Sequence, residues 1–348
     1  MLGFGNVGRA FADLIQEKET DLRDDFGLTL RVVGIATGSH GAAVNPSGIL
    51  LEEALGLVRD GFSLNELSIE PISGSGEFIQ RCPADALLET TPVSYQDGQP
   101  ALNYLSSALQ QGMHAVTANK GPVVHGYREL SGLAREVGKS FFFESAVMDG
   151  APVFSIGRCG MPGARVNAIR GVFNSTTNLI LTRMEEGRSF EEAVAYTQEI
   201  GIAETDPSGD IDGWDAAIKV AALVTVLMDI PLTPDQVRRT GIREITRDQV
   251  RKAAAKDQRW KLVCSARRSS ANPAGVEAAV QPELVDAASP LYHVTGTSAV
   301  LQIESDVLGK LSLREDHPSP RTTAYGLLAD LLNAVRSDPA LFQAGSPG

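Results

Sequence analysis

Apolar segments of strand length alternate with helical segments through the first 147 residues of this 348-residue chain. Strands are expected at 30–37, 84–93, 113–118 and 140–147, and helices at 51–58, 100–112 and 127–138. This alternation is typical of a parallel sheet with helices on both faces. We therefore predict an α/β fold with a doubly wound parallel sheet over residues 1–150.

The chain opens with the glycine pattern G-x-G-x-x-G, and a helical segment follows it directly. In this pattern the first glycine permits a tight turn, the second lets the backbone approach a pyrophosphate, and the third lets helix and strand pack closely. The helix N-terminus then faces the phosphates. The pattern predicts a Rossmann-type dinucleotide site. The expected cofactor contacts at this turn are Gly3, Gly5, Asn6, Val7 and Gly8.

The first strand of such a sheet is central and buried, yet only Met1 and Leu2 precede the glycine turn. Either the chain as given starts late, or its central strand is a stub. In both cases we expect weaker cofactor binding and lower stability for this domain.

The end of the second predicted strand bears on the choice of cofactor. NAD enzymes usually carry a carboxylate there for the ribose hydroxyls, whereas this chain has Thr37, Ser39 and His40. These side chains can donate hydrogen bonds to a 2′-phosphate, so we predict NADP, or use of both NADP and NAD. Thr91 is a further predicted cofactor contact. Lys120 is another, because ligands of open α/β sheets bind just past the carboxyl ends of strands.

The regular alternation of predicted strands and helices ends after residue 150. Strands are expected at 164–174, 259–267, 275–282, 298–305 and 309–314, with helices between them. This order predicts a second, α+β domain over 151–320, with a mixed sheet whose outer face could form a homodimer. A final helix within 321–340 is expected to pack back on the first domain and complete it.

The segment 201–219 carries the densest set of charged groups. Its carboxylates are Glu204, Asp206, Asp210, Asp212 and Asp215. Asp212 is expected to cap the helix that follows. On that helix Asp215 and Lys219 are four residues apart and share a face. An apolar run follows Lys219, so this lysine either pairs with a carboxylate and serves a substrate or lays its stem on the surface with its ammonium in water.

Composition excludes several classes of function. The net charge is −12 and the pI about 5.0, which argues against nucleic-acid and anionic-membrane surfaces. Three scattered cysteines and five scattered histidines lack zinc-binding spacing, and a reduced cytoplasmic compartment is expected. We find no signal peptide and no apolar run long enough to span a bilayer.

Five motifs in this order resemble the homoserine dehydrogenase family over nearly the whole chain. They are GFGNVG at 3–8, ANKGPV at 118–123, GVFNSTTNLIL at 171–181, AETDPSGDIDGWDAAIK at 203–219 and GLLADLL at 326–332. The resemblance implies a Rossmann domain and a mixed-sheet catalytic and dimerisation domain. It also implies NAD(P)-dependent interconversion of L-homoserine and L-aspartate 4-semialdehyde, a step in the biosynthesis of threonine, methionine and isoleucine.

The resemblance also implies roles for individual residues. Lys219 and Lys120 would lie near the reacting oxygen, with proton transfer assigned to Lys219 and polarisation to Lys120, although the two roles could be exchanged. Asp215 would belong to the same carboxylate network. Substrate contacts would come from Glu204, Asp210, Asn174 and Thr176, and a structural sodium ion from Glu144, Val147 and Asp149.

Three departures from the family pattern bear on these roles. Ser175 stands where the family usually has glycine, so its side chain could crowd the substrate. Met148 and Asp149 replace the small residues of the usual turn near the sodium ion. EDHPSP at 315–320 replaces a glycine-rich loop expected to contact the cofactor. With 348 residues, no C-terminal regulatory domain is expected.

Two other functions stay open at this point. One is a related NAD(P)-dependent oxidoreductase acting on another small amino or hydroxy acid, which Ser175 and the 315–320 loop favour. The other is a degenerate homologue that binds a metabolite without turnover, which the short first strand favours.

Overall fold

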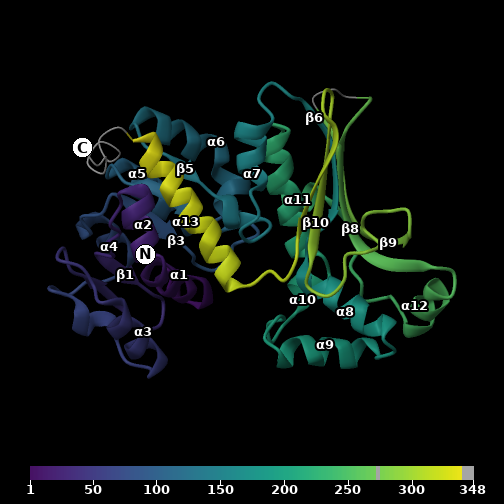
Figure 1. Ribbon diagram of the computed structural model, residues 1–348, viewed down its shortest axis with the longest axis horizontal. Coiled ribbons are helices and arrows are strands. Elements are labelled where there is room, and N and C mark those ends of the chain that lie inside the picture. The colour runs from purple at the N-terminus through teal and green to yellow at the C-terminus, as the bar shows by residue number, and fades with distance from the viewer. Residues whose placement is uncertain (272–274, 339–348) are drawn as a thin grey trace. The chain divides into compact units, whose positions relative to one another are not determined.

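The computed structural model describes residues 1–271 and 275–338 (Figure 1). The chain divides into two compact units. The first comprises Met1–Gly150 and the described residues from Ser319 onward, and the second comprises Ala151–Pro318.

A twisted sheet forms the centre of the first unit. Three strands run parallel in the order β3 (Ala86–Glu89), β4 (His114–Thr117) and β5 (Phe141–Phe142). β1 (Gly34–Ala36) pairs with β2 (Ala42–Val44) in antiparallel register. Leu2 joins the two groups, because it makes parallel bridges to Ala36 of β1 and to Glu89 of β3. The stub of the first strand therefore occupies the central position.

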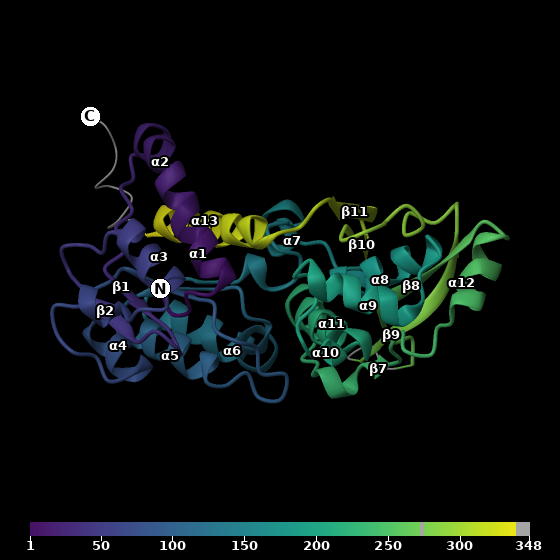
Figure 2. The ribbon, with the colours of Figure 1, turned by 90° about the horizontal axis from the view of Figure 1, so that it is seen from below.

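Helices cover both faces of this sheet. They are α1 (Asn6–Glu17), α2 (Glu19–Phe26), α3 (Leu51–Arg59), α4 (Ser75–Arg81), α5 (Ala101–Gln110), α6 (Lys120–Glu136) and α13 (Pro320–Ser337), with short 3₁₀ turns η1 (Leu64–Leu67) and η2 (Glu144–Ala146). Figure 2 shows α1 and α13 together on one side of the sheet and α4 and α5 on the other.

α13 is far from α1 in sequence but packs against it in one apolar cluster. Phe11 and Ile15 of α1 meet Leu327 and Leu331 of α13 over Leu88 of β3. The start of α13 is fixed by a capping box, in which the Ser319 side chain and Thr322 satisfy each other's backbone. The last helix of the chain thus forms part of the first unit.

Three predicted elements differ from the structure. The strand expected at 30–37 is reduced to β1, because the stub offers pairing only from Gly34 onward. The strand expected at 140–147 ends at Phe142, where the chain turns into η2. The helix expected from 127 begins at Lys120, because the Asn119 side chain accepts a hydrogen bond from Gly121 N and caps it.

The second unit is built on a six-stranded sheet in the order β11-β10-β6-β8-β9-β7. All neighbours are antiparallel except β7 and β9. The strands are β6 (Val166–Val172), β7 (Arg238–Arg239), β8 (Gln258–Arg268), β9 (Val276–Asp286), β10 (Ala299–Ser305) and β11 (Gly309–Glu315).

The second unit also contains helices and short helical turns. They are α7 (Val153–Ser155), a π-helical turn η3 (Ile156–Gly160), α8 (Ser175–Glu185), α9 (Phe190–Glu199), α10 (Ser208–Ile211), α11 (Trp214–Leu227), a 3₁₀ turn η4 (Pro234–Gln236) and α12 (Arg247–Ala254). α8, α11 and α12 all contact β8. The predicted α+β architecture is therefore confirmed. Within the described residues, no helix is both long and apolar enough to cross a membrane.

Candidate active site

The glycine turn of the first unit has the backbone that the pattern predicts. Gly3 has φ of +98°, and a Cβ there would lie 2.6 Å from Oγ1 of Thr90. A Cβ on Gly8 would lie 2.6 Å from the carbonyl oxygen of Gly3. A Cβ on Gly5, in contrast, would meet no heavy atom within 4 Å. The side of the turn at Gly5 is open, just where α1 begins at Asn6.

The loop after β1 is closed by its own side chains. The Thr37 hydroxyl donates to the carbonyl of Gly41 (3.2 Å) and accepts from the backbone N–H of His40 (2.7 Å). Ser39 Oγ and His40 Nδ1 lie 2.8 Å apart. The hydroxyl of Thr37 therefore shapes the loop, while Ser39 is exposed. The NADP preference stays a prediction.

A buried carboxylate that the sequence analysis missed organises the carboxyl ends of β3 and β4. Glu89 is fully buried and accepts hydrogen bonds from the hydroxyls of Thr91 (2.5 Å) and Thr117 (2.6 Å). Burial raises the pKa of Glu89, while these hydrogen bonds oppose the shift. Asn119 extends the network, because its side-chain amide donates to the carbonyl of Thr91 (3.2 Å). The network fixes the segment from which Lys120 starts.

Lys120 is the first residue of α6, directly after the strand end where it was predicted. It is half-buried, and the preceding Asn119 is buried. The cap by Asn119 fixes the direction in which α6 begins and so the position of the lysine backbone.

In the second unit, Asn174 brings two carboxylates together. Its side-chain amide donates to Asp210 (2.6 Å) and to Asp215 (2.9 Å). Its side-chain oxygen accepts from the backbone N–H of Thr177 (2.9 Å) and so caps α8. Asp215 pairs with Lys219 at 3.0 Å. Asn174 is therefore the centre of a cluster that joins α8, α10 and α11.

The Lys219 ammonium is held in place by this cluster. Its Nζ lies 3.0 Å from Asp215 and donates to the carbonyl of Phe173 at 2.8 Å. The Lys219 and Asp215 side chains are 15% and 13% exposed, so neither lies free in water. Of the two alternatives left open for Lys219, the structure shows the pairing with Asp215. Within the described residues, these contacts account for two of the three ammonium donors.

The other carboxylates of 201–219 lie outside the lysine cluster. Asp206 accepts from the backbone N–H of Ser208, and Asp212 pairs with Arg243 at 3.0 Å. The prediction that Asp212 caps α11 is wrong: the cap position is Gly213, whose φ of +82° puts it in the left-handed region. Glu204 is exposed and takes a hydrogen bond through its backbone carbonyl. The structure thus brings only Asp210 and Asp215 into the lysine cluster.

The pKa of Asp210 is higher than that of an ordinary surface aspartate. Burial raises its pKa, and the neighbouring Asp215 raises it further, while hydrogen bonds from Asn174 and Thr176 oppose the shift. Such a carboxylate gains most from a bound cation. Burial also raises the pKa of Cys264 to about 12, so that thiol stays protonated and is not a nucleophile.

Ser175 does not crowd the lysine cluster. Its hydroxyl donates to the carbonyl of Thr297 at 3.0 Å, in the loop that precedes β10. The departure from the family pattern therefore adds an anchor between α8 and this loop.

A model of the homoserine dehydrogenase family matches residues 152–332, just over half of the chain. The chain belongs to the homoserine dehydrogenase family. The resemblance drawn from the motifs is thereby confirmed.

Relatives of the whole chain agree with this. An NAD(+)-dependent homoserine dehydrogenase of Pseudomonas canavaninivorans is 32% identical over 97% of this chain and 96% of its own length. The homoserine dehydrogenase of Methanocaldococcus jannaschii is 32% identical over 97% of this chain and 98% of its own. A solved hyperthermophilic archaeal homoserine dehydrogenase in complex with NADPH has a TM-score of 0.79 and 30% identity, covering 97% of both chains.

The three residues that the resemblance predicts to bind a sodium ion lie on a largely buried turn of the first unit. The Glu144 N–H donates to Asp330 at 2.6 Å, and the Asp149 carboxylate accepts from Thr323. Val147 between them is buried. No cluster of three or more His, Cys, Asp or Glu side chains suited to a metal exists among residues 1–271 and 275–338. A carboxylate and backbone carbonyls would suit a hard cation, and this site stays a prediction from the resemblance.

Sequence reasoning also missed Lys261 of β8, which is fully buried. Its ammonium donates to the side chain of Asn178 (3.0 Å) and to the carbonyl of Val294 (2.5 Å). Asn178 in turn donates to the carbonyls of Gly296 and Ser298. Lys261 thus connects α8 to the loop that also anchors Ser175.

The titration of Lys261 gives a pH prediction. Burial lowers its pKa to about 8 from 10.5, so between these values the unfolded chain binds the proton more tightly than the folded one. Folding stability should therefore rise as the pH rises from about 8 towards 10.5. Denaturant midpoints measured across this range for the wild type and Lys261→Met check it, and a gain that persists in the variant would assign the effect to other groups.

Proposed function

We propose that this member of the homoserine dehydrogenase family interconverts L-homoserine and L-aspartate 4-semialdehyde, with NADP or NAD as cofactor. The observation that carries the proposal is the cluster of Asn174, Asp210, Asp215 and Lys219, which places one remaining ammonium donor beside half-buried carboxylates. A zwitterionic amino acid that carries a hydroxyl or aldehyde needs both groups.

The substrate ammonium is assigned to Asp210. Burial and the charge of Asp215 raise the pKa of Asp210, and Lys219, which pairs with Asp215, opposes the shift less than these two causes raise it. A bound ammonium would replace the water that Asp210 has lost. Thr176, which is buried and bonded to Asp210, orients that carboxylate, and Glu204 is the second candidate for the ammonium.

Proton transfer is assigned to Lys219. When the aldehyde is reduced, its carbon receives a hydride and its oxygen must receive a proton; the oxidation reverses both. NADP or NAD, when bound, supplies or accepts the hydride. The remaining donor of Lys219 gives its proton to the oxygen, and Asp215 and the Phe173 carbonyl keep the ammonium aimed. The assignment of Lys120 to polarise the reacting oxygen, or to exchange roles with Lys219, stays a prediction from the resemblance.

The cofactor is assigned to the glycine turn, and Gly5 provides the sharpest test. Its φ of −77° suits any residue, and a Cβ there has open space, so Gly5→Ala should fold with an unchanged melting temperature. If the pyrophosphate packs on this face, the methyl should raise the Kd for NADPH about tenfold or more. Fluorescence titration measures the Kd. Gly56→Ala on α3, whose Cβ would meet only Arg59, is the control. An unchanged Kd for Gly5→Ala would move the cofactor elsewhere.

The assembly and its location are proposed as a cytoplasmic homodimer. The six-stranded sheet borders a cavity of about 650 Å³, lined by residues that include Arg170, Arg267 and Glu304. Its mixed charges suit a second copy of the same face. The free cysteines Cys82 and Cys264 are buried without a disulfide, which suits a reducing compartment.

The proposal is tested by reduction of NADP and of NAD with L-homoserine at alkaline pH, beside other three- and four-carbon hydroxy acids. We expect homoserine to give the highest kcat/KM of the set. Turnover of another acid without homoserine would establish the related oxidoreductase instead. Cofactor binding without turnover of any of them would establish the non-catalytic homologue.

A further inference from the structure

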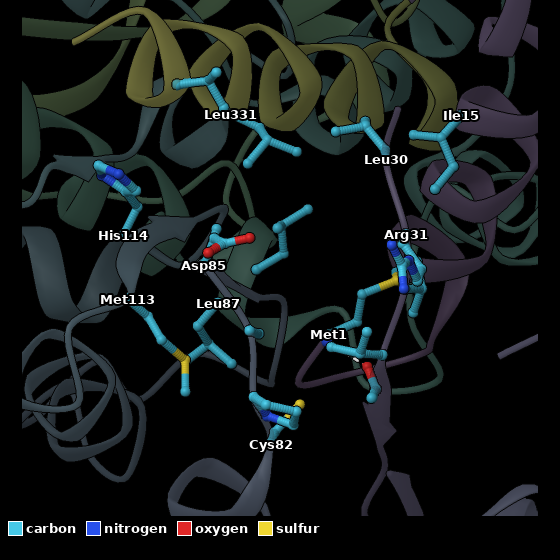
Figure 3. A pocket seen from close by; sticks show the side chains of 18 of the residues that line it. Met1, Ile15, Leu30, Arg31, Cys82, Asp85, Leu87, Met113, His114 and Leu331 are labelled. Atoms are coloured by element: carbon cyan, nitrogen blue, oxygen red, sulfur yellow. Dashed lines mark hydrogen bonds between the residues drawn. The ribbon is translucent and has the colours of Figure 1, made fainter. Parts of the chain in front are cut away.

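Two buried carboxylates lie at opposite ends of the parallel strands β3 and β4. At the start of β4, Met113 and His114 line a cavity of about 580 Å³ whose walls are mostly apolar (Figure 3). Asp338, which contacts His114, is buried there and pairs with Lys139 at 2.7 Å. At the carboxyl ends of the strands Glu89 is fully buried, and within the described residues it has no such ion pair. The buried charge of Glu89 is therefore left without a cation.

The groups that bond Glu89 are all uncharged donors. One carboxylate oxygen accepts from the N–H (2.6 Å) and the hydroxyl (2.5 Å) of Thr91, and the other accepts from the hydroxyl of Thr117 (2.6 Å). The oxygen of the Thr117 hydroxyl in turn accepts from the N–H of Asn119 (2.8 Å), so its proton is directed to Glu89. Three donors suit the ionised carboxylate, because a protonated one would need an acceptor for its own proton.

Glu89 lies beside the glycine turn. It makes a parallel bridge with Leu2, and the hydroxyl of the next residue, Thr90, donates to the carbonyl of Gly3 (3.1 Å). On the other side, its partner Thr117 ends β4, shortly before α6 begins. The carboxylate is therefore buried under the carboxyl edge of the sheet, between the turn assigned to the pyrophosphate and the start of α6.

The proposed cofactor has one half that extends over this edge. Along it β1, the glycine turn, β3 and β4 follow one another. The adenosine half of a dinucleotide belongs to the loop after β1, and the pyrophosphate to the glycine turn. The nicotinamide half then continues towards β3 and β4, where Glu89 is buried. The nicotinamide ring carries a positive charge when it is oxidised and none when it is reduced.

We propose that the buried Glu89 carboxylate makes this site favour NADP⁺ or NAD⁺ over the reduced cofactor, because only the oxidised ring brings the cation that the carboxylate lacks. This preference rests on the cofactor site proposed above. A buried charge without an opposite charge is unfavourable, and a cationic ring nearby relieves it. Removing the charge of Glu89 should therefore weaken the binding of the oxidised form more than that of the reduced form.

The test is the ratio of the Kd for the oxidised cofactor to the Kd for the reduced one, measured by isothermal titration calorimetry with NADP⁺ and NADPH and with NAD⁺ and NADH. In Glu89→Gln, the amide oxygen can still accept from Thr91 and the amide nitrogen can donate to Thr117, so the network keeps its shape. For the pair that the wild type binds more tightly, the ratio should rise about tenfold, with the Kd of the reduced form changed less than about twofold. Glu129→Gln, the same change at an exposed position of α6, should leave the ratio unchanged.

Glu89→Asp separates the charge from the shape of the network. Aspartate keeps the charge but withdraws the carboxylate from Thr91 and Thr117, so both Kd values should rise together and their ratio should stay within about threefold of the wild type. An unchanged ratio in Glu89→Gln would overturn the preference. So would a tenfold higher ratio in Glu89→Asp, which decides the question by itself if the glutamine variant does not fold. A wild type that binds neither form would contradict the proposed function as well.

Discussion

Replacing Lys219 by methionine is expected to lower kcat for homoserine oxidation by about 10²–10⁴-fold, the usual contribution of one general acid or base. Methionine keeps the apolar stem but removes the ammonium that Asp215 and the Phe173 carbonyl hold. The KM for homoserine should change less than kcat, because the group acts on the oxygen during reaction. Steady-state kinetics in both directions measure both constants.

The control for this variant is Lys252→Met on α12, an exposed lysine outside the cluster. It should retain wild-type kcat. Circular dichroism should show that both variants are folded. A Lys219→Met enzyme that keeps kcat within about threefold of the wild type would remove Lys219 from proton transfer.

Replacing Asn174 by aspartate is expected to lower kcat/KM by about 10²-fold or more. The change places a third carboxylate 2.6 Å from Asp210 and 2.9 Å from Asp215, where the amide now donates. Burial and Asp215 already hold the pKa of Asp210 above its ordinary value. The added negative charge should raise the pKa of Asp210 further. Asp210 would then bind a proton in place of the substrate ammonium.

Aspartate caps helices as well as asparagine does, so α8 should survive this substitution. Thr246→Asp at the cap of α12 is the matched control, because it makes the same kind of change away from the cluster. It should leave kcat/KM unchanged. The pH profile of kcat/KM for Asn174→Asp should lose its acid side at a higher pH than the wild type. Identical profiles would show that Asn174 does not control these carboxylates.

Local patterns predicted those parts of the site that depend on neighbours in sequence. The spacing of Asp215 and Lys219 along one helix placed them on one face, where the structure shows that they pair. The glycine turn followed in the same way, because the strain at Gly3 and the clash at Gly8 arise from the backbone of the turn itself.

Contacts across long sequence distances could not be predicted in this way. Asp212 was expected to cap α11, but its partner Arg243 lies 31 residues further on. Glu89 lies inside the strand that was predicted at 84–93, and only the fold brings Thr117 to it. Lys261 stands in an apolar strand, and no spacing rule connects it with Asn178, 83 residues earlier. Asn174 was found only through its family motif.

The most direct test of the account is a crystal structure with NADPH and L-homoserine bound together, a pair that cannot react with each other. We predict that Nζ of Lys219 lies about 3 Å from the homoserine hydroxyl, and that the substrate ammonium contacts Asp210. A hydroxyl beyond the reach of Lys219, or an ammonium bound away from Asp210, would contradict this prediction.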